Sequence, residues 1–127
     1  MDGNIDREEI YEKKLSFSRI RVRVTKVGED YSILTTGGEK PHIGCTVLSV
    51  PRPSLTGDGS VSVTSSVINL TGHKDEKICR YLAEQTAKKK NAVVSCSGGF
   101  HMDDITETQI TEVMAAVAEI AQEISKG

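Results

Sequence analysis

The sequence predicts a two-layer α+β domain, in which a mainly antiparallel sheet of about five strands carries two helices on one face. Three observations support this prediction. The apolar pattern gives four strands, a helix, a short strand and a last helix, in that order. The strand pattern has one apolar and one largely polar face, which is typical of a sheet covered on one side only. The 127 residues make a single domain, which we place at 15–127, after a polar tail or short helix at 1–14.

The first two strands are predicted to form a hairpin. Apolar residues alternate over 15–24, with a slip in phase near Ser18 and Arg19 that a β-bulge would cause. A turn at 27–30 then leads into a returning strand at 31–35. The opposite face of the first strand carries a basic stripe, which we interpret as solvated rather than as a docking site for an acidic partner: Arg19, Arg21 and Arg23.

Two further strands follow, at 43–50 and 60–70. The first should end at Pro51-Arg52-Pro53, because proline cannot donate a hydrogen bond to a sheet. Residues 51–59 contain prolines and glycines and are predicted to be an exposed connection. In the strand at 60–70, hydroxyl side chains occupy one face and valines the other.

Two helices complete the prediction. The first spans about 73–90, with Asp75 and Glu76 in its first turn and three lysines in its last, as the helix dipole favours. Its inner face should carry Ile78, Tyr81, Leu82 and Ala87. A short buried strand at 92–94 precedes the last helix, where Thr106 and Gln109 form a capping box. An apolar stripe then marks core packing or a dimer face: Ile110, Val113, Met114, Val117, Ile120, Ala121 and Ile124.

Composition excludes several classes of function. A formal net charge of -2 argues against a protein that grips a nucleic-acid backbone. No apolar run reaches the roughly 20 residues that cross a bilayer, so no membrane role is expected. Cys45, Cys79 and Cys96 show no CxxC spacing, and an odd number of cysteines fits a reducing compartment. We therefore expect a cytoplasmic protein with the three thiols buried as small apolar groups.

Each of the three histidines lies in a glycine-containing junction, at 36–44, 70–75 and 93–106. We hypothesise that these junctions meet in space and form the working site. Glycine backbone N–H groups and a helix N-terminus can bind an anion, although a simple hairpin turn at 36–44 and an ordinary helix entry at 70–75 are open alternatives. The candidate binding residues are Gly37, Gly38, His42, Gly44, His73, Lys74, Ser97, Gly98, Gly99 and His101.

Other chemistries of these histidines are less well supported. Their spacing shows no i, i+4 pair of the kind that binds zinc on a helix. A catalytic His–Asp pair of His101 with Asp103 is conceivable. Asp103 or Asp104 is better explained as a residue that caps the last helix. We expect no catalytic residue and no metal ligand, and favour a protein that is not an enzyme.

At the three junctions the sequence resembles the prenylated-flavin chaperone family called LpdD-like, which supplies an accessory component of gallate and hydroxyarylic acid decarboxylases. The matching elements are Gly37-Gly38, Pro41–Gly44, His73–Asp75 and Ser97–Thr106, and their order and spacing agree over roughly Leu15 to Ile124. The resemblance implies a fold similar to small dimeric assembly chaperones, including the proteasome-assembling kind. It also implies that seven of the candidate residues carry over to the family's site: His42, Gly44, His73, Lys74, Gly98, Gly99 and His101.

The function that the resemblance implies is that of an accessory chaperone for a UbiD-type decarboxylase. It would bind or deliver prenylated FMN or FMN, form a homodimer, and have the catalytic chain of the decarboxylase as its partner. A flavin ring would need an apolar wall, for which Phe100, Met102 and Tyr31 are the few candidates. The alternatives are a ligand-free dimeric assembly chaperone and, less favoured, a small metal-dependent enzyme built on the three histidines.

Overall fold

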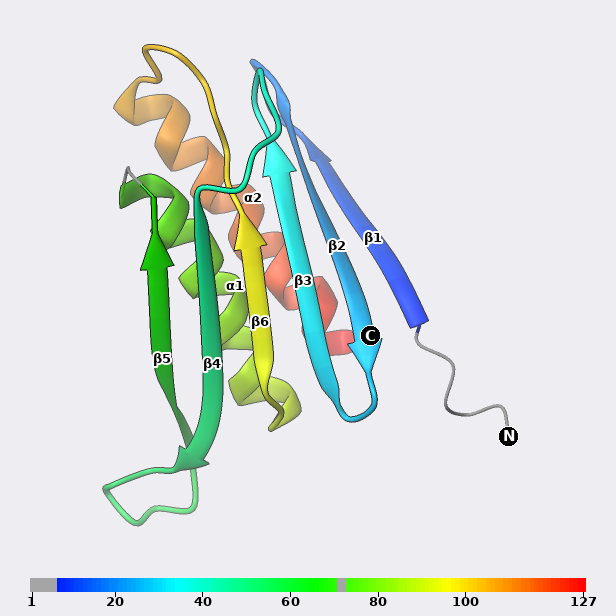
Figure 1. Ribbon diagram of the computed structural model, residues 1–127, viewed down its shortest axis with the longest axis vertical. Coiled ribbons are helices and arrows are strands. Elements are labelled where there is room, and N and C mark those ends of the chain that lie inside the picture. The colour runs from blue at the N-terminus through cyan, green and yellow to red at the C-terminus, as the bar shows by residue number, and fades with distance from the viewer. Residues whose placement is uncertain (1–6, 71–72) are drawn as a thin grey trace.

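The computed structural model describes residues 7–70 and 73–127, without the side chains of His73 and Lys74. Its elements, in chain order, are β1 (Arg7–Lys14), β2 (Arg19–Val27), β3 (Asp30–Gly37), β4 (Cys45–Pro53), β5 (Val61–Asn69), α1 (His73–Lys90), β6 (Val94–Gly98) and α2 (Glu107–Lys126). The strands form one sheet in the order β1-β2-β3-β6-β4-β5, and both helices lie on the same face of it (Figure 1). The predicted two-layer α+β class is confirmed, with slightly more strands than expected.

The sheet is antiparallel except where β6 runs parallel to β3. β2 and β3 form the predicted hairpin, with Val27 opposite Asp30 and Gly28 at a φ of 61° in the turn. Glycine adopts a positive φ without steric strain because it has no Cβ, so Gly28 suits this tight turn. β6 pairs with β3 on one side and with β4 on the other, and so joins β1, β2 and β3 to the β4–β5 hairpin in a single sheet.

The residues expected to be a tail instead contribute an edge strand. Residues 7–14 form β1, which pairs with β2 from Arg7 opposite Lys26 to Lys14 opposite Arg19. Charged side chains on an edge strand discourage pairing with another chain, and they also remove the apolar alternation that reveals a strand. The slip near Ser18 is the turn between β1 and β2, closed by a hydrogen bond from Leu15 N–H to Ser18 O of 2.8 Å, rather than a bulge.

β4 extends through the prolines that were expected to end it. It pairs with β5 as far as Pro53 opposite Val61, whereas its pairing with β6 stops at Ser49. Beyond Ser49 no strand of the described residues pairs with that side of β4. A proline is tolerated at such an edge because no hydrogen bond is required on that side.

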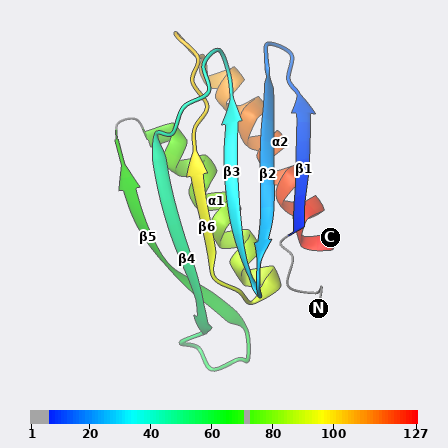
Figure 2. The same cartoon turned by 45° about the vertical axis from the view of Figure 1, so that its right-hand side comes forward.

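The core lies between the sheet and the helices. α1 packs against β4, β5 and β6, and α2 against α1, β1 and β2 (Figure 2). Ile78, Leu82 and Ala87 are buried as predicted, but Tyr81 is 36% exposed. The capping box at Thr106 and Gln109 is confirmed. Five of the seven residues of the α2 stripe are buried in the core: Val113, Val117, Ile120, Ala121 and Ile124. Each fully buried aliphatic side chain contributes about 1.5–3 kcal/mol.

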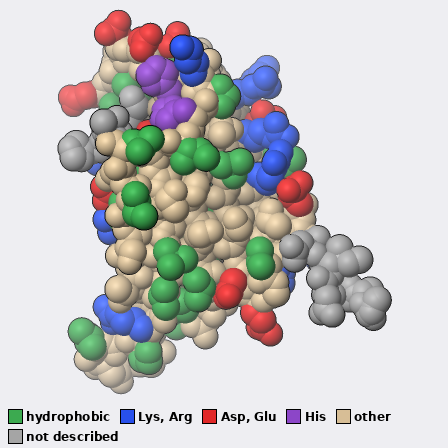
Figure 3. All heavy atoms as spheres, in the orientation of Figure 1, with side chains coloured by type: hydrophobic (Ala, Val, Ile, Leu, Met, Phe, Trp, Pro, Cys, Tyr) green, Lys and Arg blue, Asp and Glu red, His purple; other side chains and the backbone are tan. Residues whose placement is uncertain are grey.

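In the part of the chain that the structure describes, no element covers the face of the sheet away from the helices. It is rich in serine and threonine, and it also exposes the aliphatic side chains Leu34, Leu48, Val50 and Ile68 (Figure 3). We call it the open face. Within residues 7–70 and 73–127, neither helix has the length and apolar character that a membrane span requires.

Candidate functional site

The strand order brings the three histidine-bearing junctions to one end of the sheet. β3 and β4 follow each other in the chain but are separated in the sheet by β6, so residues 38–44 cross the end of β6. β5 ends beside the start of β4, with Asn69 opposite Cys45, and α1 therefore begins at the same end. Gly44 N–H donates to Gly98 O at 2.9 Å, and Gly38 forms a bridge with His101. The junctions adjoin one another, as hypothesised.

A buried carboxylate, that of Asp75, links the three junctions. Its side chain is 5% exposed and lies in the first turn of α1. One oxygen, Oδ1, accepts a hydrogen bond of 2.9 Å from the backbone N–H of Phe100, and Oδ2 lies 3.0 Å from Nε2 of His42. Because a carboxylate only accepts, the proton of this contact is on Nε2, and Nδ1 of His42 is left for other partners.

Sequence reasoning missed this role of Asp75. It was assigned to the helix dipole, although it stands in the His73–Asp75 element on which the resemblance rests. An acidic residue within a histidine-bearing motif is the signal in the sequence from which the role of Asp75 could have been predicted.

Gly44 and Gly99 make room for the His42–Asp75 pair. A Cβ at Gly99 would lie 2.8 Å from Asp75 Oδ2 and 2.9 Å from His42 Nε2, and a Cβ at Gly44 would also clash with both side chains. The N–H of Gly99 donates to Thr35 O at 3.0 Å, and that of Gly44 is bound to Gly98 O. These two amides are occupied by protein carbonyls, so they do not form the predicted phosphate cradle.

The remaining glycines hold the 38–44 connection against the segment after β6. Gly38 and Gly98 have φ values of 83° and 134°, and a side chain on either would collide with the backbone of the facing segment. Glu39 N–H donates to His101 O at 2.7 Å, and His101 N–H to Gly37 O at 3.3 Å. These contacts fix the backbone that carries His42 and His101.

The two histidines form a pair at one end of the open face. The rings of His42 and His101 meet edge to face, with centroids 5.5 Å apart, and their side chains are 35% and 40% exposed (Figure 3). His101 Nε2 lies 3.3 Å from Asp103 Oδ1, so each imidazole has its own carboxylate. Nearby on this face, the Ser97 and Thr46 hydroxyls are 3.0 Å apart. We call His42 and His101 the histidine pair.

Several expectations near the pair need correction or stay untested. Neither Asp103 nor Asp104 caps α2, because Thr106 does so with its own hydroxyl. α1 begins at His73, but the side chains of His73 and Lys74, like Thr71 and Gly72, lie outside the described residues.

The apolar wall predicted for a flavin ring is not present at the site. Phe100 is 1% exposed and packs edge to face on Phe17, with centroids 6.0 Å apart. Tyr31 lies opposite Val94 at the other end of β3, and Met102 packs against the core. A chain with 4% aromatic residues uses Phe100 in its core, so the open face offers aliphatic and hydroxyl groups instead.

The three cysteines lie in the core and are free and buried, as predicted. Burial, and next the neighbouring Cys79, raise the pKa of the Cys45 thiol to about 12. A hydrogen bond with Cys96, together with burial, raises the pKa of Cys79 as well. Protonated, buried thiols are poor nucleophiles and poor metal ligands. Among the residues that the structure describes, no group of three or more His, Cys, Asp or Glu side chains is placed to hold a metal.

Comparison with known proteins identifies the family. A family model described as the prenylated flavin chaperone LpdD-like domain matches residues 15–127. The chain belongs to this family. The LpdD-like match contains every candidate binding residue and Asp75, and it starts just after β1.

One solved structure shows the same fold as this LpdD-like domain. It is a chain of a chaperone complex for yeast 20S proteasome assembly, with a TM-score of 0.56 and 12% sequence identity. The alignment covers 93% of this chain and 91% of that one. The expected similarity to proteasome-assembling chaperones is thus confirmed at the level of the fold. A search of curated proteins finds no match.

Proposed function

We propose that this LpdD-like domain is a non-catalytic accessory protein that binds prenylated FMN, or FMN, and delivers it to a UbiD-type decarboxylase. Membership of the prenylated flavin chaperone family supports a flavin as the cargo. The observation that carries the proposal is the histidine pair, held half-exposed at the end of the open face by the buried Asp75.

The residues present fit the polar edge of a flavin ring. That edge alternates hydrogen-bond donors and acceptors, and Nδ1 of His42 is the ring nitrogen left to bind it because Nε2 is bound to Asp75. The backbone around the pair is fixed by hydrogen bonds, so little ordering is needed on binding. Aliphatic side chains of the open face, such as Leu34, could cover part of the ring in place of the missing aromatic wall. Hydrogen bonds and apolar contacts are what a carrier needs, because a carrier holds its ligand and does not convert it chemically.

Calorimetry with FMN and with anaerobically prepared prenylated FMN tests the proposal. We expect the prenylated form to bind, and His42→Ala and His101→Ala to weaken binding by about tenfold or more, as loss of about 1.4 kcal/mol implies. The His73→Ala, Lys74→Ala double variant tests the remaining candidate residues. If neither FMN nor prenylated FMN binds, the ligand part of the proposal is wrong. The absorption spectrum of protein purified from a strain that makes prenylated FMN is an independent check.

A ligand-free dimeric assembly chaperone is the second candidate, and two observations favour it. The fold is shared with a proteasome-assembly chaperone, and the open face exposes Leu34, Leu48, Val50 and Ile68, which no described part of the chain covers. A homodimer built on that face would lose stability with Leu48→Asp, which light scattering would show as a monomer.

Capture of partners from the native host separates the two candidates. Recovery of a UbiD-type decarboxylase agrees with both, whereas recovery of an unrelated assembly leaves only the second. A cytoplasmic site of action is part of both proposals and is supported by the three free, buried thiols.

A further inference from the structure

A surface cavity of about 250 Å³ lies beside the histidine pair on the open face. It is lined by Arg19 and Arg21 of β2, Thr36 and Gly37 at the end of β3, Gly38 and Pro41 of the following connection, and Glu12 of β1. We call it the arginine pocket. Gly37 and Gly38 contribute backbone to its wall, since a Cβ on Gly37 would meet the Phe100 ring and one on Gly38 the backbone of His101.

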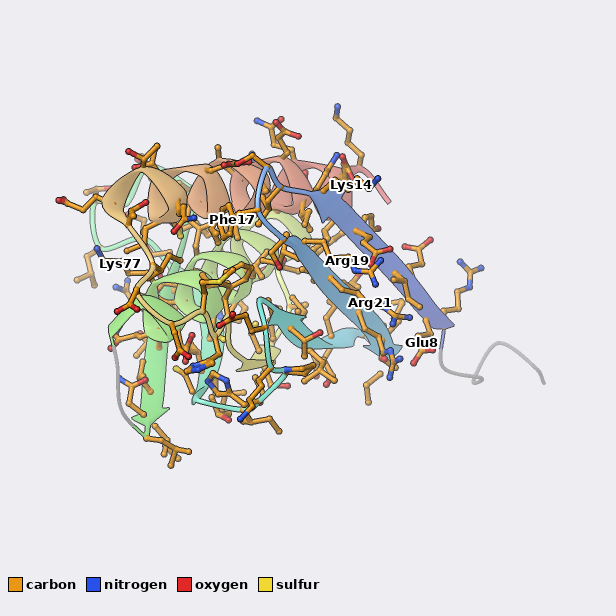
Figure 4. All side chains as sticks on the ribbon, turned by 90° about the horizontal axis from the view of Figure 1, so that it is seen from above. Glu8, Lys14, Phe17, Arg19, Arg21 and Lys77 are labelled. Atoms are coloured by element: carbon orange, nitrogen blue, oxygen red, sulfur yellow. The ribbon has the colours of Figure 1, made fainter. Side chains whose placement is uncertain are left out.

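The charge of the arginine pocket is positive. Arg19 and Arg21 occupy alternate, outward-facing positions of β2 (Figure 4). Arg19 lies 3.5 Å from Glu12, and both side chains are well exposed. Arg21 stands opposite Glu12 and Thr36 in the sheet register, and among the described residues it forms no ion pair of its own. Two guanidinium groups thus face one carboxylate.

The basic stripe on β2 was interpreted as a solvated face, and the cavity changes that interpretation for two of its three arginines. Arg23 pairs with Glu8 at 3.8 Å and does not line the pocket. Arg19 and Arg21 instead line a concave surface together with a threonine and two glycines. Guanidinium groups bind phosphate through paired hydrogen bonds, and a hydroxyl can add a further donor.

We propose that the arginine pocket binds the terminal phosphate of a flavin mononucleotide whose ring lies at the histidine pair. This assignment rests on the proposed function and adds an orientation to it. The pocket and the pair share one short stretch of backbone, because Gly38 bridges to His101 and Pro41 precedes His42. A ligand with a polar ring at one end and a phosphate at the other, joined by a flexible chain, matches this arrangement. The phosphate is thereby placed away from the α1 N-terminus, where His73 and Lys74 had suggested it.

The test compares flavins that differ only in the phosphate. Affinities of FMN and riboflavin, and of prenylated FMN and its dephosphorylated form, are measured for the wild type and for the Arg19→Gln, Arg21→Gln double variant. We expect the wild type to favour the phosphorylated member by about 10- to 100-fold, as about 1.4–2.8 kcal/mol implies. The double variant should reduce that preference to less than about threefold while its affinity for the dephosphorylated member stays the same.

Two matched variants make the result specific. Arg23→Gln removes the same charge from the same strand and face but outside the arginine pocket, so it should keep the preference for phosphate. His73→Ala with Lys74→Ala should keep it too. Circular dichroism and thermal melting establish that each variant is folded.

The possible failures can be told apart. Flavin binding with an unchanged phosphate preference in the arginine double variant would overturn the pocket and leave the proposed function standing. Loss of the preference in the His73, Lys74 variant instead would move the phosphate to α1 and also overturn the pocket. No binding of any flavin by the wild type would overturn both proposals.

Discussion

Replacing Asp75 by alanine tests whether one carboxylate holds the site together. The substitution removes the acceptor for Phe100 N–H and the partner of His42 Nε2, at distances of 2.9 and 3.0 Å. Phe100 is 1% exposed, so water cannot easily replace the lost acceptor. We therefore expect a loss of stability that is large for a single residue.

The magnitude follows from the surroundings. A hydrogen bond to a charged group contributes about 1.5–3 kcal/mol, and a buried donor left unsatisfied costs about 1–3 kcal/mol. The two figures describe largely the same loss and are not added. Loss of an acidic residue from the first turn of α1 adds about 0.3–1 kcal/mol. Removing a buried charge also relieves a desolvation cost, which offsets part of the sum. A net loss of about 2–3 kcal/mol remains, against a total stability of about 5–15 kcal/mol for a domain.

Urea unfolding followed by circular dichroism measures this loss. Asp75→Asn keeps an oxygen for Phe100 N–H and should lose less than half as much as Asp75→Ala. Asp103→Ala is the matched control, because that carboxylate also contacts a histidine but its side chain is 79% exposed. We expect it to change stability by less than about 0.5 kcal/mol. If Asp75→Ala were as mild as the control, the carboxylate would not be the link between the junctions.

Three further predictions concern packing and pH. Gly99→Ala should cost about 1–3 kcal/mol by crowding the His–Asp pair, and less in an Asp75→Ala background, which a double-mutant cycle in urea measures. Burial, and then a hydrogen bond to Glu9, raise the pKa of Tyr11 to about 12. The stabilising effect of the neutral phenol is therefore complete below pH 10.0 and is lost as the pH rises to about 12. Ultraviolet titration should show a late phenolate phase that Tyr11→Phe removes. Hydrogen bonds from the backbone and side chain of Ser16 hold the pKa of Glu112 below 4.5. This contact therefore stabilises the fold above pH 4.5, and the stabilisation is lost as the pH falls through the lowered pKa. Glu112→Gln should reduce the acid dependence of the melting temperature.

The elements that follow a clear periodicity could be predicted from the sequence. The β2–β3 hairpin, the bounds of α1 and the capping box of α2 all have local signals that the structure confirms. β1 has none, because an edge strand with charges on both faces lacks alternation. The extension of β4 through Pro53 depends on where β6 stops, and that is a property of the sheet rather than of the segment.

The candidate site was predictable in its location and not in its mechanism. Glycine and histidine in three junctions indicated which segments to bring together. The use of Gly44 and Gly99 could not be predicted, because a glycine that offers its N–H to an anion and one that makes room for a side chain look the same in sequence. Only their positions against Asp75 and His42 distinguish the two roles.

The strand order explains both the position of the site and why its residues fall into a buried structural group and an exposed group. Because β6 separates β3 from β4, residues 38–44 must pass over the end of β6, and the histidine pair is formed where they do. Asp75 is buried beneath that crossing, so its substitution changes stability and binding together and cannot by itself identify a ligand contact. Arg19 and Arg21 lie beside the crossing on an exposed face, and their removal leaves the core untouched. A selective loss of affinity in the arginine variants is therefore stronger support for a bound anion than any substitution in the buried network.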